Sequence, residues 1–289
     1  MRSVQEMLEL IIGTARQDDR VRAVILNGSR ANPNAPRDPF QDFDVVYLVQ
    51  DISPFWHNLE WIERFGERMI LQMPELMQDP PPNRDGSFSY LMQFSDGNRI
   101  DLTIAPLANL EQFTRDSLTE ILLDKDARIQ YLPPASDRDY FPQPPSPKAF
   151  GDCCNEFWWI CPYIAKGLWR GEILYARHFL DYSLRDQLLK MLTWYAGFRT
   201  GFSRSLGKNG KYLQGQLEPG IWQRLLDTYC DADYEHTWQA LFAACELFRE
   251  VAMVVAEKLD LDYPLADDHQ VSAYLNHIRC LPGNANEIY

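Results

Sequence analysis

A proline-rich segment divides the chain into two halves with different hydrophobic patterns. Between residues 132 and 147 stand Pro133, Pro134, Pro142, Pro144, Pro145 and Pro147. Because proline fixes φ and lacks a backbone N–H, this segment favours an extended connection over a sheet or helix. Short apolar runs precede it, and helical spacing follows it. We therefore predict an α+β domain over residues 1–135, a linker over 136–150 and a helical bundle over 151–289.

Hydrophobic spacing predicts the elements of each half. In the first half, strands are expected over residues 21–26, 43–49, 88–94 and 99–104, with helices over 4–15, 56–65 and 107–123. Asp96-Gly97 lies between the last two strands and predicts a β-hairpin. In the second half, helices are expected over residues 152–169, 172–202, 219–229, 234–259 and 271–279. The fold class is therefore a small mixed sheet with helices, followed by a helical bundle.

Three carboxylates carry most of the functional information. Asp42 and Asp44 open the second expected strand, shortly after a Gly28-Ser29 turn, and Asp101 lies on the second arm of the expected hairpin. Residues two apart on a strand share a face, so Asp42 and Asp44 project together. Carboxylate and phosphate oxygens are the ligands that Mg²⁺ prefers. A third carboxylate allows a second ion or a general base, so the layout predicts a magnesium site for a nucleoside triphosphate, with two ions.

Each of these signals also has a structural explanation. Aspartate is common in turns, and Gly-Ser after a strand is often only a turn before a helix N-cap. Asp101 could pair with Arg99, which shares its face, and merely support the hairpin. The combination and order of the three carboxylates favour the metal site. Asp101 also lies between apolar Ile100 and Leu102, where a bare carboxylate would be costly.

Composition excludes several classes of function. The net charge of −13 and the lack of a basic stripe argue against a nucleic-acid partner. The same charge would attract a cationic small molecule, or would serve solubility alone. No apolar run approaches the roughly 20 residues of a membrane span, and the opening residues do not resemble a signal peptide, so we expect a cytoplasmic protein without membrane association. Six cysteines without a Cys-x-x-Cys pair, and five scattered histidines, disfavour zinc.

The sequence resembles the aminoglycoside 6-nucleotidyltransferases, or streptomycin adenylyltransferases, of the polymerase-β-like nucleotidyltransferase superfamily. The Asp-x-Asp pair belongs to the whole superfamily, whereas narrower blocks carry the resemblance to this family. Those blocks are Met1-Arg2-Ser3-Val4-Gln5-Glu6-Met7, Asp96-Gly97-Asn98-Arg99-Ile100-Asp101-Leu102-Thr103, Cys153-Cys154-Asn155-Glu156-Phe157-Trp158 and Lys166-Gly167-Leu168. Together with Gly28-Ser29-Arg30 and the Asp-x-Asp pair, they span almost the whole chain.

The resemblance implies Mg²⁺-dependent transfer of AMP from ATP to a hydroxyl of streptomycin, with release of pyrophosphate and resistance to the antibiotic. It implies phosphate contacts from Gly28 and Ser29, metal ligation by Asp42 and Asp44, and a catalytic role for Asp101. Two cations are further candidates. Lys166 matches a helical lysine that reaches the triphosphate in similar enzymes, or is a solvated residue near the helix end. We expect Arg30 to pair with phosphate, the alternative being a structural pairing with Asp42 and Asp44. Pro162 stands just before Lys166 and would kink the expected helix.

The acceptor site is less constrained by the sequence. Glu156 and Asp181 in the helical half are candidate contacts for a cationic aminoglycoside, and a monomer is expected. Three other classes stay open: a transferase of the same superfamily with another acceptor, such as a protein hydroxyl, a non-catalytic nucleotide-binding or toxin–antitoxin module, and a template-independent RNA nucleotidyltransferase. The intact carboxylates count against the second class, and the acidic charge disfavours an RNA nucleotidyltransferase.

Overall fold

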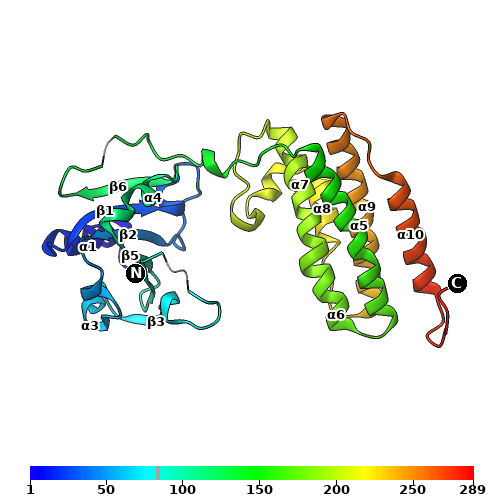
Figure 1. Cartoon of the computed structure of the whole chain (residues 1–289), viewed down its shortest axis with the longest axis horizontal. Coiled ribbons are helices and arrows are strands. Elements are labelled where there is room, and N and C mark those ends of the chain that lie inside the picture. Colours follow the sequence, from blue (N-terminus) through cyan, green and yellow to red (C-terminus); the bar gives the residue numbers. More distant parts are fainter. Residues whose placement is uncertain (83–84, 130) are drawn as a thin grey trace. The chain divides into compact units, whose positions relative to one another are not determined.

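The chain forms two compact units, Met1–Asp139 and Tyr140–Tyr289, each with its own hydrophobic core. The structure is a computed structural model that describes residues 1–82, 85–129 and 131–289 (Figure 1). The division between the units falls inside the proline-rich segment. Helix α5 already begins at Pro147, so the last four residues of the predicted linker 136–150 are helical.

The first unit contains a mixed sheet, which confirms the predicted α+β class. Among the described residues six strands form the order β3-β4-β5-β2-β1-β6. Strands β2 and β5 pair in parallel, and every other neighbouring pair is antiparallel. The strands are β1 (Val21–Asn27), β2 (Phe43–Val49), β3 (Arg68–Gln72), β4 (Phe88–Phe94), β5 (Arg99–Pro106) and β6 (Thr119–Asp124).

Alternating side chains divide the sheet into two faces. One face packs on helix α1 (Val4–Gln17) and on the turns around α3 (Leu59–Ile62), and it includes Phe43 and Val45 of β2. The other face is smaller, includes Val46 and Leu48, and is covered by the segment of α4 (Leu110–Thr114). Because β2 alternates strictly, the side chain of Asp44 belongs to this second face.

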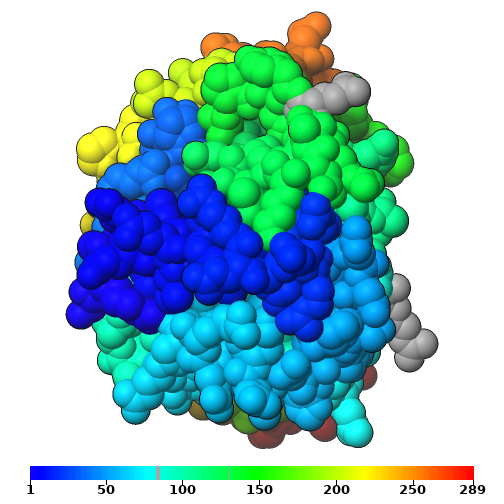
Figure 2. Space-filling view, turned by 90° about the vertical axis from the view of Figure 1, so that its left-hand side faces the viewer, coloured from blue at the N-terminus to red at the C-terminus, as the bar shows by residue number. Residues whose placement is uncertain are grey.

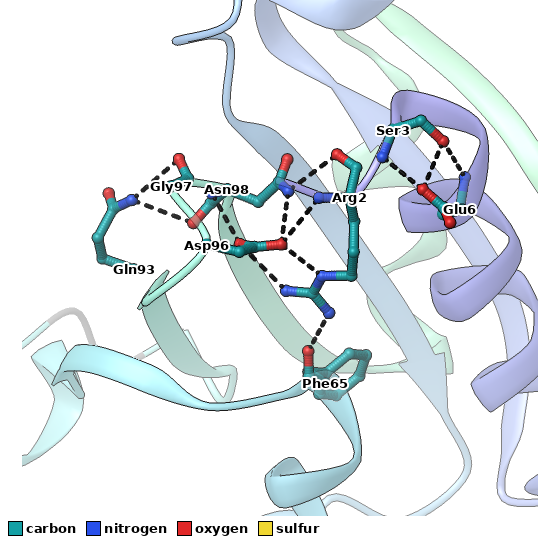
Figure 3. Close-up of polar contacts among 8 residues, drawn as sticks. All are labelled: Arg2, Ser3, Glu6, Phe65, Gln93, Asp96, Gly97 and Asn98. Carbon is teal, nitrogen blue, oxygen red and sulfur yellow. Dashed lines mark hydrogen bonds and ion pairs between the residues drawn. The ribbon is translucent and has the colours of Figure 1, made fainter.

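The N-terminal residues hold the turn of the β4–β5 hairpin (Figure 3). Arg2 donates from its backbone N at 3.0 Å and its Nε at 2.7 Å to Oδ2 of Asp96, and its Nη1 donates to the carbonyl of Phe65 at 2.6 Å. Asn98 in turn donates to the carbonyl of Arg2. In the space-filling view, the dark blue N-terminal segment adjoins the cyan segment around β3 (Figure 2). These bonds fix the hairpin from which β5 starts.

Three predictions for this unit were wrong in detail. The segment 107–123, predicted to be helical, contains only a 3₁₀ turn and α4 before it continues as edge strand β6. The segment 56–65 holds one helical turn, α3, between 3₁₀ turns rather than a full helix. Strand β3, at the other edge of the sheet, was not predicted, because its residues are half or fully exposed and show no alternation of burial.

The second unit is helical, as predicted, and its core is rich in Leu, Trp and Phe. Its helices are α5 (Pro147–Trp169), α6 (Ile173–His178), α7 (Arg185–Thr200), α8 (Pro219–Leu226), α9 (Tyr234–Leu259) and α10 (Leu265–Cys280), with a π-helical segment (Phe179–Leu184) between α6 and α7. Helix α5 continues through Pro162 to Trp169. None of the helices in the described part of the chain is both long and apolar enough to span a membrane.

A buried carboxylate anchors the last helix of this unit. Asp268 of α10 is 0% exposed and accepts two hydrogen bonds from Arg249 of α9, at 2.5 and 2.6 Å. Tyr263 and Ser272 donate to the same carboxylate, and Trp158 of α5 donates to the hydroxyl of Tyr263. The network joins α5, α9 and α10, and each buried polar group in it has a partner, as burial requires.

Candidate active site

The turn after β1 lies directly against the second aspartate of the Asp-x-Asp pair. Gly28 opens the short helix α2 (Gly28–Ala31) with φ +71°, a conformation that favours glycine. A Cβ atom placed on Gly28 would lie 2.9 Å from Cγ of Asp44 and closer still to its Oδ2. Only a residue without a side chain therefore lets the Asp44 carboxylate approach this turn.

The three predicted carboxylates lie on one face of the sheet. Asp42 precedes β2 and Asp44 lies in it, while Phe43 between them is fully buried on the opposite face. Asp101 of β5 is the register partner of Asp44 in the parallel pairing of β2 with β5. Parallel neighbours in register project to the same side of a sheet. The predicted grouping of Asp44 and Asp101 thus follows from the pairing of two strands that are distant in sequence.

Arg99 lies among these carboxylates. Its Nε and Nη2 donate to the two carboxylate oxygens of Asp101 at 2.7 Å each, and its Nε lies 3.7 Å from Oδ2 of Asp42. The hydrogen bonds to Asp101 raise the pKa of Arg99 despite partial burial. Burial raises the pKa of Asp42, while Arg99 acts to lower it. The ion pair considered for Asp101 in the sequence is therefore present, and it extends toward Asp42.

The donor set fits a magnesium ion that is shared with a nucleotide. Within residues 1–82, 85–129 and 131–289, no group of three His, Cys, Asp or Glu side chains is arranged to hold a metal ion by itself. Mg²⁺ is commonly held by only one or two carboxylates together with substrate phosphates. Asp42 and Asp44 supply two carboxylates on one face, next to a turn with room for close approach. The chemistry and placement of this pair fit such an ion.

Arg30 does not face outward from the turn. It is 9% exposed, its guanidinium stacks on the ring of Phe43 at 3.7 Å, and its Nη2 donates to the carbonyl of Gln41 at 2.6 Å. The side chain of Gln41 donates back to the carbonyl of Ser29 at 3.2 Å. The turn and the start of β2 are thus joined by two reciprocal bonds. Sequence reasoning assigned no role to Gln41, and its type and position gave no signal for one.

In the helical unit, Glu156 lies in a groove of about 620 Å³ between α5 and α7. The groove is lined by Ala149, Asp152, Cys153, Asn155, Glu156, Gln187, Lys190 and Trp194. Cys153, Asn155 and Glu156 belong to the Cys-Cys-Asn-Glu-Phe-Trp block quoted above. Sequence reasoning singled out Glu156 but missed the polar residues of α7 that complete the groove, because no local pattern links the two helices.

The other two candidates in this unit lie apart from the groove. Lys166 is ten residues beyond Glu156, about 15 Å along α5 at 1.5 Å per residue, and its Nζ lies 4.8 Å from the ring centre of Tyr163. Asp181 is in the π-helical segment and forms ion pairs with Arg177 at 2.9 Å and Arg185 at 3.8 Å. Neither Lys166 nor Asp181 is therefore among the residues that line the groove of Glu156.

Comparison with known proteins gives a consistent result over almost the whole chain. A family model described as streptomycin adenylyltransferase matches residues 1–278. Proteins named aminoglycoside 6-adenylyltransferase are 41% identical over 282 residues in Bacillus subtilis (strain 168), covering 97% of this chain and 99% of that protein, and 44% identical over 276 residues in Campylobacter jejuni, covering 95% of each.

Two further similarities are a relative and a solved structure. The Staphylococcus aureus protein of the same name is 39% identical over 266 residues, covering 91% of this chain and 94% of that protein. A crystal structure of an aminoglycoside 6-adenyltransferase from Bacillus subtilis is 38% identical, covers 97% of this chain and 100% of that chain, and has a TM-score of 0.49. On the family match and the three relatives, the chain is a nucleotidyltransferase enzyme and belongs to the streptomycin adenylyltransferase family.

Proposed function

We propose that the protein transfers AMP from Mg²⁺-ATP to a hydroxyl of streptomycin and releases pyrophosphate. The observation that carries the proposal is the Asp42–Asp44 pair on one face of β2, beside the Gly28–Ser29 turn and in register with Asp101. This is the arrangement that an adenylyl transfer needs, because the reaction depends on holding and neutralising a triphosphate rather than on covalent participation of the protein.

Asp42 and Asp44 would hold the magnesium ion, and Asp101 would hold a second ion or accept the proton of the attacking hydroxyl. Bound metal supplies charge neutralisation for the triphosphate. The hydroxyl of Ser29 and the amides of the turn would bind the terminal phosphates, where Gly28 permits close approach. Arg99 donates one bond to each oxygen of that carboxylate, and release of these bonds would make Asp101 fully available to a metal ion or a proton. The released guanidinium then becomes available as a donor to an anionic phosphate.

The groove between α5 and α7 is the best candidate for the cationic acceptor. It presents the carboxylate of Glu156, and the amides of Asn155 and Gln187 add hydrogen-bonding capacity. Asp152 also lines the groove, but its carboxylate is paired with Lys148 at 2.7 Å, and Lys190 adds one positive charge to the lining. A guanidinium-bearing acceptor would gain charge-assisted hydrogen bonds from such a surface. Asp181 is a weaker candidate, because its carboxylate already has two arginine partners.

One experiment tests the reaction. Purified protein is incubated with radiolabelled ATP and Mg²⁺, and pyrophosphate release is followed with streptomycin, with a protein extract, or with neither. We expect release that depends on streptomycin and label that appears on the drug. Label on protein would instead favour a transferase with a protein acceptor, and binding of ATP without any transfer would favour a non-catalytic module.

A matched pair of variants tests the acceptor groove. Glu156→Gln should raise the KM for streptomycin by about 10- to 100-fold, the range expected for one charge-assisted hydrogen bond, with the KM for ATP unchanged. Asp181→Asn removes a carboxylate of the same unit that lies outside the groove and should leave the KM for streptomycin unchanged. A raised KM for streptomycin in Asp181→Asn, with an unchanged KM in Glu156→Gln, would instead place the acceptor site at the π-helical segment.

A further inference from the structure

Two segments of the proposed site are joined by hydrogen bonds from the side chains of Arg30 and Gln41. The Gly28–Ser29 turn and the start of β2 are separated by a loop that contains Pro33, Pro36 and Pro39. Across this loop the side chain of Arg30 donates to the backbone of Gln41, and the side chain of Gln41 donates to the backbone of Ser29. We name this pair the Arg30–Gln41 clasp.

The clasp sits behind the carboxylates rather than among them. Arg30 stacks on Phe43, and Phe43 projects from β2 to the face opposite Asp44. Arg37 adds a third bond, from its Nη1 to the carbonyl of Arg30 at 2.9 Å. On the other side Gly28 lies close to Asp44, so the turn adjoins β2 on both sides.

The placement of Arg30 carries a local energetic cost, which it shares with the buried Arg185 of the helical unit. The Nε of Arg30 is buried without a hydrogen-bond partner among the residues that the structure describes. A buried guanidinium with an unbonded N–H is less favourable than an apolar side chain of similar size. Proteins concentrate such local costs at functional sites.

We propose that Arg30 and Gln41 are positioning residues, which lock the phosphate-binding turn to the metal-binding carboxylates before the nucleotide arrives. This inference rests on the proposed function only in taking Mg²⁺-ATP as the ligand. In place of a direct phosphate contact, Arg30 acts through the backbone of Gln41, next to Asp42. A preformed site avoids the ordering cost that a loose turn would add to each binding event.

The test measures binding of Mg²⁺-ATP by calorimetry without any acceptor, together with amide hydrogen exchange of residues 28–31 and 41–44 in the ligand-free protein. Arg30→Met and Gln41→Ala should each weaken Mg²⁺-ATP binding by about tenfold, the loss of one such bond, and should speed exchange in both segments. Arg30→Lys keeps a donor for the carbonyl of Gln41 and should recover part of the affinity. In turnover, the KM for ATP should rise while the KM for the acceptor stays unchanged.

The matched control is Arg20→Met. Arg20 also stacks on a phenylalanine of the first unit, Phe55 at 4.4 Å, and pairs with Asp18, but it lies outside the turn. The Arg20→Met substitution should leave Mg²⁺-ATP binding and the amide exchange of both segments unchanged. If Arg30→Met fails to fold, the result for Gln41→Ala tests the clasp alone, because this substitution removes only one hydrogen bond of a half-buried side chain.

Three outcomes separate the clasp from the proposed function. Normal Mg²⁺-ATP affinity and normal exchange in Gln41→Ala and Arg30→Met overturn the clasp, even if thermal stability falls. Weakened binding in these variants, with a wild-type protein that does not modify streptomycin, supports the clasp and overturns only the acceptor. A wild-type protein that binds no Mg²⁺-ATP overturns the proposed function, and the exchange rates then decide whether the clasp orders the turn.

Discussion

Replacing Gly28 by alanine isolates the contact between the turn and Asp44. The new Cβ would lie 2.9 Å from Cγ of Asp44, whereas carbon atoms normally approach to about 3.5 to 4.0 Å. The carboxylate must therefore retreat by about 0.6 to 1.1 Å. A displacement of about 1 Å in a catalytic group can cost about 10²-fold in turnover, and we expect a loss of that size in Gly28→Ala.

The same substitution also strains the backbone, and this second effect needs its own control. A non-glycine residue at φ +71° costs about 1 to 2 kcal/mol of folding free energy. Gly97 in the β4–β5 turn of the same unit has φ +89°, and a Cβ placed there meets nothing within 4 Å among the described residues. Gly97→Ala should therefore lose similar stability and keep its turnover.

The assay compares both variants in calorimetric unfolding, in Mg²⁺-ATP binding and in streptomycin-dependent pyrophosphate release. Gly28→Ala should unfold cooperatively, with weakened Mg²⁺-ATP binding and low turnover. Turnover within a few-fold of wild type in folded Gly28→Ala would refute the argument, because Asp44 would then tolerate displacement. Equal losses of turnover in both variants would show that backbone strain, not the contact, is responsible.

Three further predictions address other parts of the molecule. If Asp101 is a general base, Asp101→Asn should lower turnover by about 10²- to 10⁴-fold while Mg²⁺-ATP binding is retained. Weakened Mg²⁺-ATP binding that added Mg²⁺ partly restores would identify Asp101 as a metal ligand. Near-normal turnover would show that Asp101 has only the structural role of pairing with Arg99. The KM for streptomycin should rise with salt, because screening acts over about 8 to 10 Å at physiological ionic strength; a KM that does not change would assign the acidic charge to solubility. Burial acts to raise the pKa of Asp268, but bonds from Arg249 and others outweigh it and lower the pKa. The stabilisation from Asp268 is therefore present above about pH 4 and is lost as the pH falls. At neutral pH Asp268→Asn should cost about 3 to 5 kcal/mol in urea unfolding, against about 0.5 kcal/mol for the exposed Asp152→Asn.

The parts of the fold that could be predicted are those set by local pattern. The β4–β5 hairpin follows from two apolar runs around Asp96-Gly97, and helix α9 begins at Tyr234 and ends at Leu259, as its spacing indicates. Strand β6 could not be predicted in this way. Its apolar residues also fit a helix, and its extended form is stabilised by pairing with β1, which is distant in sequence.

The same distinction applies to the site. The shared face of Asp42 and Asp44 follows from the period of a strand, and the same period allows the pairing of Asp101 with Arg99 as a structural alternative. The register of Asp44 with Asp101 depends on the parallel pairing of β2 with β5, which no local pattern encodes. The side chain of Arg30 points inward because it stacks on the ring of Phe43, and a sequence motif does not specify the direction of a side chain.

The separate cores of the two units determine how any variant must be judged. Trp56 and Trp61 are the only tryptophans of the eight in the sequence that precede the division between units, and the other six belong to the helical unit. Intrinsic fluorescence therefore reports mainly on the helices, and a catalytic variant with a melted sheet would still give a largely native emission spectrum. A chain with two cores also need not unfold in a single two-state step, so one melting temperature does not describe it. Loss of activity in a sheet variant can be attributed to chemistry only after calorimetry, or exchange at strands β2 and β5, has shown that the sheet is intact.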